Sequence, residues 1–306
     1  MTASLVFTQL LNGVQLGALL FLLSAGLTLV FGIMSFVNLA HGSLFMMGAY
    51  FAAAAYEQTN SFGFAALAAL CGTLVLGLLV ERLVVSRMYR REHLDQVLVT
   101  FGMMLFFNEL ARIFWGPTAV YAGGPAGFEG SIEFAGLSYP SYRLLIIAVA
   151  LLVAALLYFL IHRTRLGMLV RAGASRPDMV SALGVDVARL KRWLFALGAL
   201  MAGLAGLMAG PITSVQPGMG EPVLIMTLVV IVTGGIGSIR GAFYGAMIVG
   251  IVDTAGRAFL PLLLRELFDR QVAQAAGPAI ASVLIYVFMA SVLAARPQGL
   301  FPVRHG

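Results

Sequence analysis

The side chains that could carry out catalysis are few in this sequence and widely separated. The four histidines, His41, His93, His162 and His305, lie far apart, and no Gly-x-Ser-x-Gly or His-Glu-x-x-His motif occurs. The single cysteine, Cys71, excludes an internal disulfide and any multi-cysteine metal site, and its apolar surroundings predict that it serves as a small hydrophobic residue. We therefore predict no catalytic, cofactor-binding or metal-ligating residue, which disfavours an intramembrane hydrolase.

Nucleotide chemistry is also missing from the sequence. A P-loop needs a lysine within a glycine-rich turn, because its charge must reach the phosphates. The only lysine, Lys191, lies between Leu190 and Arg192, outside any such turn. Any process that ATP drives through this chain would need its ATP and magnesium on a separate subunit.

Two acidic residues lie inside apolar runs, where an ion-coupled transporter would carry its titratable group. Glu109 precedes Arg112 by three residues, and Asp253 precedes Arg257 by four. Both spacings place acid and base on one face of a helix. We therefore expect self-paired structural charges, and an ion-coupled secondary transporter remains an alternative.

The composition predicts a membrane protein. Of the 306 residues, 60% are hydrophobic and 10% are charged, whereas soluble proteins carry about twice that share of charge. No polar linker divides the chain, so we expect one polytopic domain over residues 1–306. The net charge of +6 does not predict nucleic-acid binding, because the basic residues lie between apolar runs as flanks of membrane spans.

Charge-free stretches define the expected spans of an all-α bundle. Residues 1–56 precede the first charge and would make a helix of roughly 84 Å, so they must hold two passes and a break. No basic n-region follows Met1, and we expect no cleaved signal peptide. The further runs are 58–80, 96–114, 144–162, 193–220, 222–239, 241–252 extended through Asp253 and Arg257, and 271–295. This predicts about nine segments, within a range of eight to ten, with broken or re-entrant helices near 222–260.

The basic residues predict the orientation. With nine spans and the N-terminus outside, 14 of the 19 basic residues fall on the cytoplasmic side, and the C-terminus lies there too. The other five are Arg112, Arg143, Arg257, Arg265 and Arg270.

Small residues recur at four-residue intervals in the run 193–210. They are Gly198, Ala202, Gly206 and Gly210. Such a stripe lets another helix backbone approach closely, which is how helices associate in lipid. The partner is either another helix of the same bundle or a second membrane subunit.

Glycine and polar residues break the helical pattern in two apolar places, 32–43 and 233–241. Unwound backbone at membrane depth survives where it is buried in protein or lines a water-filled path. The candidate pathway residues are Asn38, His41, Gly42, Ser43, Gly234, Gly235, Gly237 and Ser238. His41 would either line the path or hydrogen-bond a neighbouring helix. The second break could instead be a cytoplasmic turn that holds Arg240 at the lipid interface.

Three segments of the sequence carry a family resemblance. They are Phe36-Val37-Asn38-Leu39-Ala40-His41-Gly42 with Gly48-Ala49-Tyr50 behind it, Gly234-Gly235-Ile236-Gly237-Ser238 with Gly241-Ala242, and Arg296-Pro297-Gln298-Gly299-Leu300-Phe301. In order and spacing, from about residue 8 to 302, they resemble LivH-type permeases, the membrane subunits of ATP-binding-cassette (ABC) importers for branched-chain amino acids. Arg240 departs from the small residue or proline expected there.

The basic loop 163–192 contains the signals of a short helix. Pro177 suits a first helical turn, Asp178 complements its positive end and Gly184 suits its stop, which leaves Met179, Val180 and Leu183 exposed. In the family this place resembles the coupling helix that docks on an ATPase subunit. The implied coupling residues are Arg171, Arg176, Asp178, Met179, Val180, Ala182, Leu183 and Gly184. A basic anchoring loop is the other interpretation.

The resemblance also implies partners and a location. The partners are two ATPase subunits, a second homologous permease subunit, a periplasmic solute-binding protein and membrane lipid, in a bacterial inner membrane. The solute would be leucine, isoleucine or valine, received near the outer loops 115–142 and 211–221. Another amino acid, urea or a short amide is the alternative solute within the same importer class.

Overall fold

The break expected within residues 1–56 separates two helices in the computed structural model. The structure describes residues 3–34, 36–89, 91–134, 137–175, 177–267 and 269–302. Helix α1 (Ala3–Met34) ends just before the break, and α2 (His41–Thr59) begins after it. The two passes expected from the first charge-free run are therefore confirmed.

The all-α class and the expected segments are also confirmed. In the described part of the chain, nine apolar helices match the nine expected runs: α1, α2, α3 (Phe62–Val80), α5 (His93–Trp115), α6 (Ser141–Arg163), α9 (Val187–Ala209), α10 (Gly220–Gly234), α11 (Ile239–Leu267) and α12 (Arg270–Ala295). Shorter elements are the π-helical η1 (Glu81–Val85), α4 (Ser86–Met88), α7 (Arg165–Ser175), α8 (Pro177–Ala182), β1 (Ser131–Phe134) and β2 (Leu137–Pro140). Seven described helical segments are long and apolar enough to cross a membrane, and α10 is shorter.

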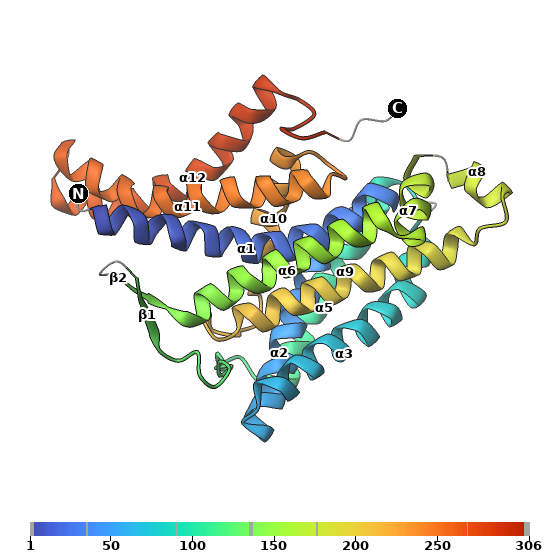
Figure 1. Ribbon diagram of the computed structural model, residues 1–306, viewed down its shortest axis with the longest axis horizontal. Helices are drawn as coiled ribbons and strands as arrows, with labels where there is room; N and C mark the ends of the chain where they lie inside the picture. The colour runs from blue at the N-terminus through green and yellow to red at the C-terminus, as the bar shows by residue number, and fades with distance from the viewer. Residues whose placement is uncertain are drawn as a thin grey trace.

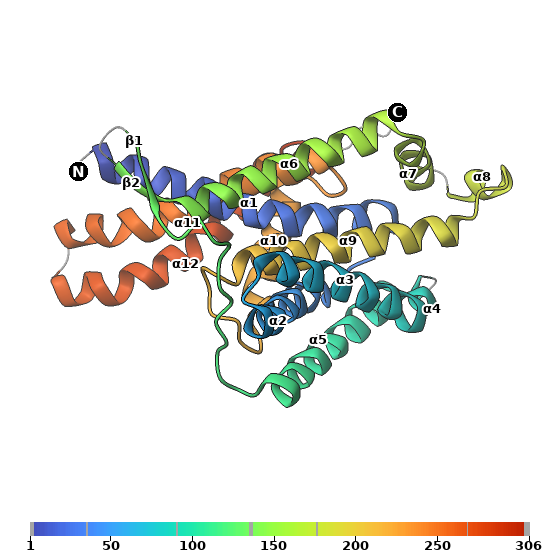
Figure 2. The ribbon, with the colours of Figure 1, turned by 60° about the horizontal axis from the view of Figure 1, so that its bottom comes forward.

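The two ends of the bundle carry different structures, as Figures 1 and 2 show. The N-terminal end of α1 and the antiparallel β1–β2 hairpin lie at one end, here called the hairpin end. Helices α7 and α8 lie at the opposite end, here called the α8 end. This separation matches the expectation that loops 115–142 and 163–192 lie on opposite sides of the membrane.

Several boundaries differ from the predicted ones. Helix α9 starts at Val187, because the Asp186 carboxylate accepts a hydrogen bond from the Arg189 amide at 2.9 Å and caps it. Lys191 and Arg192 therefore belong to α9, although we placed them in the loop 163–192. The same helix ends at Ala209, earlier than expected, and α11 continues through Pro261 to Leu267. The hairpin was not predicted, since its four-residue strands are too short to show an alternating pattern.

Helices α1 and α9 occupy the centre of the bundle, and α5, α6 and α12 lie at its periphery. Most of the apolar stretch of α1 and of α9 is buried, whereas little of α5, α6 or α12 is. The peripheral helices expose large apolar side chains such as Phe114 and Leu152. Such exposed apolar surface suits contact with lipid. Cys71 belongs to this apolar surface as well, since it is exposed on α3.

Glycines let the central helices touch through their backbones. A Cβ atom at Gly26 of α1 would lie 2.8 Å from the carbonyl oxygen of Gly198 on α9, a distance that Cβ atoms do not show. On α9, a Cβ at Gly206 would collide with the carbonyl oxygen of Phe45 on α2, and one at Gly210 would lie 2.9 Å from the Ala122 side chain. Ala202 is completely buried. The predicted stripe thus packs inside this chain and does not form a subunit interface.

We predict that Gly206→Leu destabilises the bundle, because the new side chain must displace the backbone of α2. Overpacking of this kind costs about 1–3 kcal/mol of stability. The matched control is Gly102→Leu on α5, where nothing lies within 4 Å of a Cβ position. Thermal unfolding of the purified protein in detergent should show a lower midpoint for Gly206→Leu and an unchanged or slightly higher one for Gly102→Leu. Equal midpoints for the two variants would contradict this account of the packing.

Candidate functional site

The segments around the two predicted breaks touch each other. A Cβ atom at Gly32, near the end of α1, would lie 3.0 Å from the Cα atom of Gly237. Gly237 lies in the turn between α10 and α11 with φ of 80°, a conformation that glycine adopts without strain. The end of the first helix is therefore seated against the second break.

The C-terminal segment closes the same place. The amides of Leu300 and Phe301 donate hydrogen bonds of 2.9 Å to the carbonyl oxygens of Thr233 and Gly234. These carbonyls lie in the last turn of α10, where a helix cannot satisfy them itself. Gly235, with φ of 109°, ends the helix and lies against Phe301. The second and third motif segments, together with Gly32 of α1, therefore meet around the C-terminal end of α10.

The eight predicted pathway residues nevertheless do not form one cluster. Gly42 packs against the start of α10, where a Cβ atom would lie 2.5 Å from the carbonyl oxygen of Gly220. Gly234 and Gly235 lie at the other end of this 15-residue helix, about 22 Å away at ~1.5 Å per residue. Ser238 accepts a hydrogen bond from the Gly241 amide at 3.0 Å, as a cap of α11.

Polar side chains of the first break point into the protein interior. His41 is 1% exposed, and its Nε2 atom lies 3.1 Å from the carbonyl oxygen of Leu23. This contact fits a structural histidine, one of the two roles considered for it. Asn38 and Ser43 are buried as well, and their polar side-chain atoms have no hydrogen-bond partner among the described residues.

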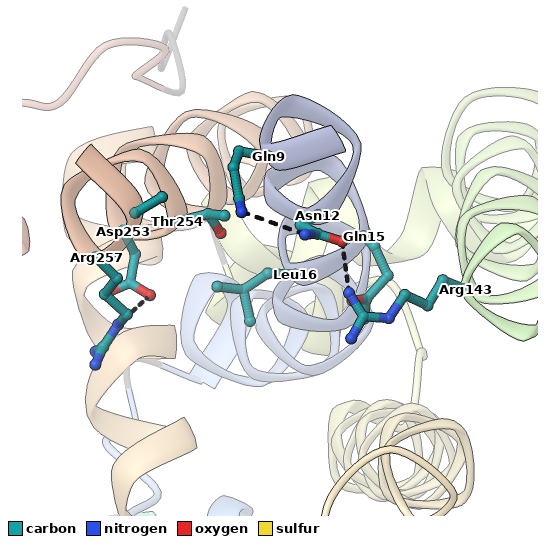
Figure 3. Close-up of a pocket in the computed structure, with 9 residues that line it drawn as sticks. Gln9, Asn12, Gln15, Leu16, Arg143, Asp253, Thr254 and Arg257 are labelled. Carbon is teal, nitrogen blue, oxygen red and sulfur yellow. Dashed lines mark hydrogen bonds and ion pairs between the residues drawn. The ribbon is translucent and has the colours of Figure 1, made fainter. Parts of the chain in front are cut away.

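A polar cavity that is wide open to the protein surface lies elsewhere, close to the hairpin end, between α1, α6 and α11 (Figure 3). Its volume is about 430 Å³, and it is lined by Gln9, Asn12, Gln15, Leu16, Arg143, Asp253, Thr254, Arg257 and Ala258. We did not predict this site from the sequence. The available signal was three amide side chains, spaced three residues apart along one face of the otherwise apolar first run.

The acid–base pairs predicted by spacing are confirmed. Arg257 Nε lies 2.8 Å from Asp253 Oδ2, and Arg112 Nη1 lies 2.9 Å from Glu109 Oε1. The two pairs differ in environment, because the Asp253 side chain is buried whereas Glu109 is exposed. Only the Asp253 pair lines the cavity.

At the α8 end, the short helix expected at 177–184 is present as α8, Pro177–Ala182. The amides of Gly184 and Val185 donate to the carbonyls of Ser181 and Val180 at 3.0 and 3.3 Å, and Gly184 has φ of 83°. This is a Schellman motif, in which glycine ends a helix in the left-handed conformation. The expected stop at Gly184 is therefore confirmed.

The exposed face of α8 is narrower than predicted. Met179 is 56% exposed and Leu183 80%, and Ala182 is also exposed. Val180 is only 6% exposed, so its predicted exposure was wrong. The Schellman turn explains the difference, since it folds the chain back and bonds Val185 to Val180.

Three of the predicted coupling residues, Arg171, Arg176 and Asp178, lie on or next to α7 and α8. Arg176 lies outside the described residues, and the Asp178 side chain does too. Arg171 on α7 donates a hydrogen bond to the carbonyl oxygen of Ile161, which fastens α7 to the end of α6.

An ion pair with a buried carboxylate ties α9 to the end of α3 near these short helices. Glu81, in the π-helical turn η1, is 1% exposed and lies 3.1 Å from Arg192 Nε. The Tyr89 hydroxyl donates to the same carboxylate at 3.1 Å, and Lys191 lies over the Tyr89 ring. Burial and the nearby Glu81 charge raise the pKa of Tyr89 far above its usual value, so it stays a donor. The sequence signal for this cluster was an acid at the end of an apolar run.

At the hairpin end, backbone hydrogen bonds join the two loops that we expect on the outer face. Val120 and Val215 exchange backbone hydrogen bonds of 2.8 and 3.0 Å, which links segment 116–130 to segment 210–219. Asn108 on α5 also donates to Glu221 at the start of α10, at 2.6 Å. The hairpin end therefore presents one connected surface.

Comparisons with known proteins match most of the chain. Residues 9–293 match a family model described as the permease component of a branched-chain amino acid transport system. The high-affinity branched-chain amino acid permease LivH of Escherichia coli K12 is 30% identical over 267 residues, which cover 82% of this chain and 86% of that protein. BraD of Pseudomonas aeruginosa, also named a branched-chain amino acid permease, is 30% identical over 81% of this chain and 85% of its own length.

A shorter match links the chain to a sugar permease. The fructose import permease FrcC of Rhizobium meliloti is 35% identical over 112 residues, 34% of this chain and 31% of that protein. No solved structure matches the chain. With a family model that spans nearly its whole length, the chain belongs to the family of permease components of branched-chain amino acid transport systems.

Proposed function

We propose that this chain is a membrane-spanning permease subunit of an ABC importer for branched-chain amino acids. The observation that carries the proposal is the family match over residues 9–293. The similarity to LivH covers 82% of the chain, whereas the similarity to a fructose permease covers 34%, which favours an amino acid over a sugar. A periplasmic solute-binding protein would deliver the amino acid to the hairpin end.

The motor would lie on two separate ATPase subunits, because the sequence has no P-loop. Helix α8 offers them a docking surface, since Met179 and Leu183 expose apolar side chains beyond the end of the bundle. Burying exposed apolar area of this kind in a partner's cleft is favourable by about 25 cal/mol per Å². We infer that α7 and α8 carry the motion of the ATPases into α9, which follows α8 directly.

A second, homologous permease subunit would complete the transport path, which alternates between the two faces of a bacterial inner membrane. The N-terminus would lie in the periplasm and the C-terminus in the cytoplasm. The distribution of basic residues supports this orientation. Arg163, Arg165, Arg189, Lys191 and Arg192 border the loop at the α8 end, as the positive-inside rule expects of a cytoplasmic side.

Uptake by the reconstituted importer tests the proposal. The chain should be produced with its partner permease, ATPases and binding protein, and sealed into proteoliposomes with ATP inside or outside. Leucine accumulation that requires ATP on the α8 side and the loaded binding protein is expected. Leucine entry driven by a proton or sodium gradient without ATP would point to a secondary transporter and overturn the proposal.

Thiol labelling tests the orientation. In a Cys71→Ala background, Arg87→Cys and Met179→Cys should resist an impermeant maleimide added to intact cells, because they lie on the cytoplasmic side. Glu129→Cys and Tyr121→Cys should react, since they belong to the segment at the hairpin end. All four should react after the membrane is permeabilised. Labelling of Met179→Cys in intact cells would place α8 on the outer side of the membrane and contradict the proposed orientation.

A charge on α8 tests its coupling role. Leu183→Asp would bury a carboxylate against apolar ATPase surface, at a cost of about 2–4 kcal/mol, or roughly 30- to 1000-fold weaker ATPase association. Tyr121→Asp is the matched control, because Tyr121 is equally exposed but lies at the hairpin end. Co-purification and substrate-stimulated ATP hydrolysis should fall for Leu183→Asp alone. Normal association of Leu183→Asp with the ATPase subunits would contradict the coupling role and favour a basic anchoring loop.

A further inference from the structure

Arg240 carries an exposed positive charge at the start of a membrane helix. It is the second residue of α11, and its side chain is exposed. No carboxylate lies within 4.0 Å of its guanidinium in the part of the chain that the structure describes, whereas Arg189 and Arg192 at the α8 end pair with Asp186 and Glu81. The charge of Arg240 is therefore available to an anion from outside these residues.

An aromatic ring of α6 holds this guanidinium in place. The Arg240 Cζ atom lies over the Tyr158 ring, 5.9 Å from its centre, within the range at which a ring attracts a cation. The His162 imidazole stacks on the same ring with the two centres 4.5 Å apart, and its Nδ1 atom lies 3.1 Å from the Tyr158 carbonyl oxygen. Arg240 and His162, from two different helices, thus lie against one ring.

The two helices bring these side chains to the level of the lipid headgroups. Tyr158 lies near the end of the span Ser141–Arg163, and Arg240 lies near the start of the span Ile239–Glu266. Both helices pack on α1, and in Figure 1 the end of α6 and the start of α11 both point toward the α8 end. Arginine and tyrosine at the ends of spans lie where the bilayer meets water.

An apolar stripe on α6 leads from this place toward the middle of the membrane. Four exposed residues recur at intervals of three or four along one face of the helix: Leu151, Ala155, Tyr158 and His162. Leu151 is 51% exposed and Tyr158 50%, and little of this span is buried. The stripe therefore offers an acyl chain an apolar surface that ends beside Arg240.

We propose that an anionic phospholipid binds here, with its phosphate against Arg240 and His162 and one acyl chain along Leu151 and Ala155. Basic pockets between membrane helices bind anionic headgroups in this way. The Tyr158 ring orients the guanidinium toward the phosphate. A zwitterionic phospholipid carries the same phosphate together with its own ammonium, which opposes Arg240, so the site favours a lipid with net negative charge. The site requires only that the chain spans a membrane, and it does not rest on the transported solute.

Native mass spectrometry of the full-length chain, purified with the subunits that accompany it, tests the site. Delipidated protein is titrated with phosphatidylglycerol and with phosphatidylethanolamine of the same acyl chains, and the dissociation constant of the tightest lipid is measured. The wild type should bind phosphatidylglycerol more tightly. Arg240→Gln should bind it roughly 5-fold more weakly, as expected for one basic residue at an anionic surface, and should bind phosphatidylethanolamine as before. Tyr158→Leu should also weaken phosphatidylglycerol, because it removes the ring that orients Arg240.

The matched control is Arg82→Gln on η1, which removes another exposed arginine that has no carboxylate within 4.0 Å among the described residues. It should bind phosphatidylglycerol as the wild type does, and the thermal midpoints of the three variants verify that they fold. Equal losses for Arg82→Gln and Arg240→Gln would indicate diffuse attraction to the surface and overturn the site.

Three further outcomes would also overturn the proposal. Equal affinity of the wild type for the two lipids would show that the headgroup charge is not recognised. Displacement of the lipid by inorganic phosphate would reduce the site to a plain anion site without an acyl-chain contact. Absence of any tightly bound phospholipid would show that another subunit covers this part of α6. Loss of ATP-dependent leucine uptake in proteoliposomes bears on the proposed function alone and leaves the lipid site standing.

Discussion

Close backbone contact at glycine is the constraint on which this bundle depends. Lipid is as apolar as leucine, so helices in a membrane gain little from hydrophobic burial and associate through tight packing. Helix α1 shows this along its length. Gly13 and Gly17 admit the backbone of α11 near Gly250, and Gly26 admits α9 at Gly198. Any side chain at these positions would separate the helices.

The glycine contact between α1 and α9 also connects the hairpin end of the molecule with the α8 end. Helix α9 begins at Val187, close after the end of α8 at Ala182, and is capped by Asp186, so only a short connection separates α8 from a central helix. Helix α9 touches α1 at the Gly26–Gly198 contact, and α1 lines the polar cavity with Gln9, Asn12 and Gln15. The proposed docking surface on α8 and the polar cavity are therefore linked through packed helices of the same bundle.

The sequence was informative wherever one local rule decided the structure. Hydropathy and charge located the nine apolar helices, Gly184 located the end of α8, and the four-residue spacing predicted the Asp253–Arg257 pair. It failed where tertiary contacts decide. Val180 is buried because the chain folds back after α8, and the break residues around Asn38 pack inside the bundle instead of gathering with the distant glycines of α10. The cavity needs three helices to converge, and no pattern within one run predicts that.

The most direct measurement is the structure of the assembled importer by electron cryomicroscopy. The central claim is that this chain transmits the work of its ATPases through α8. We predict that the Met179 and Leu183 side chains lie in a cleft of an ATPase subunit, with heavy atoms within about 4 Å of apolar partner atoms. Both side chains in solvent, with the ATPases docked on another part of the chain, would contradict the account.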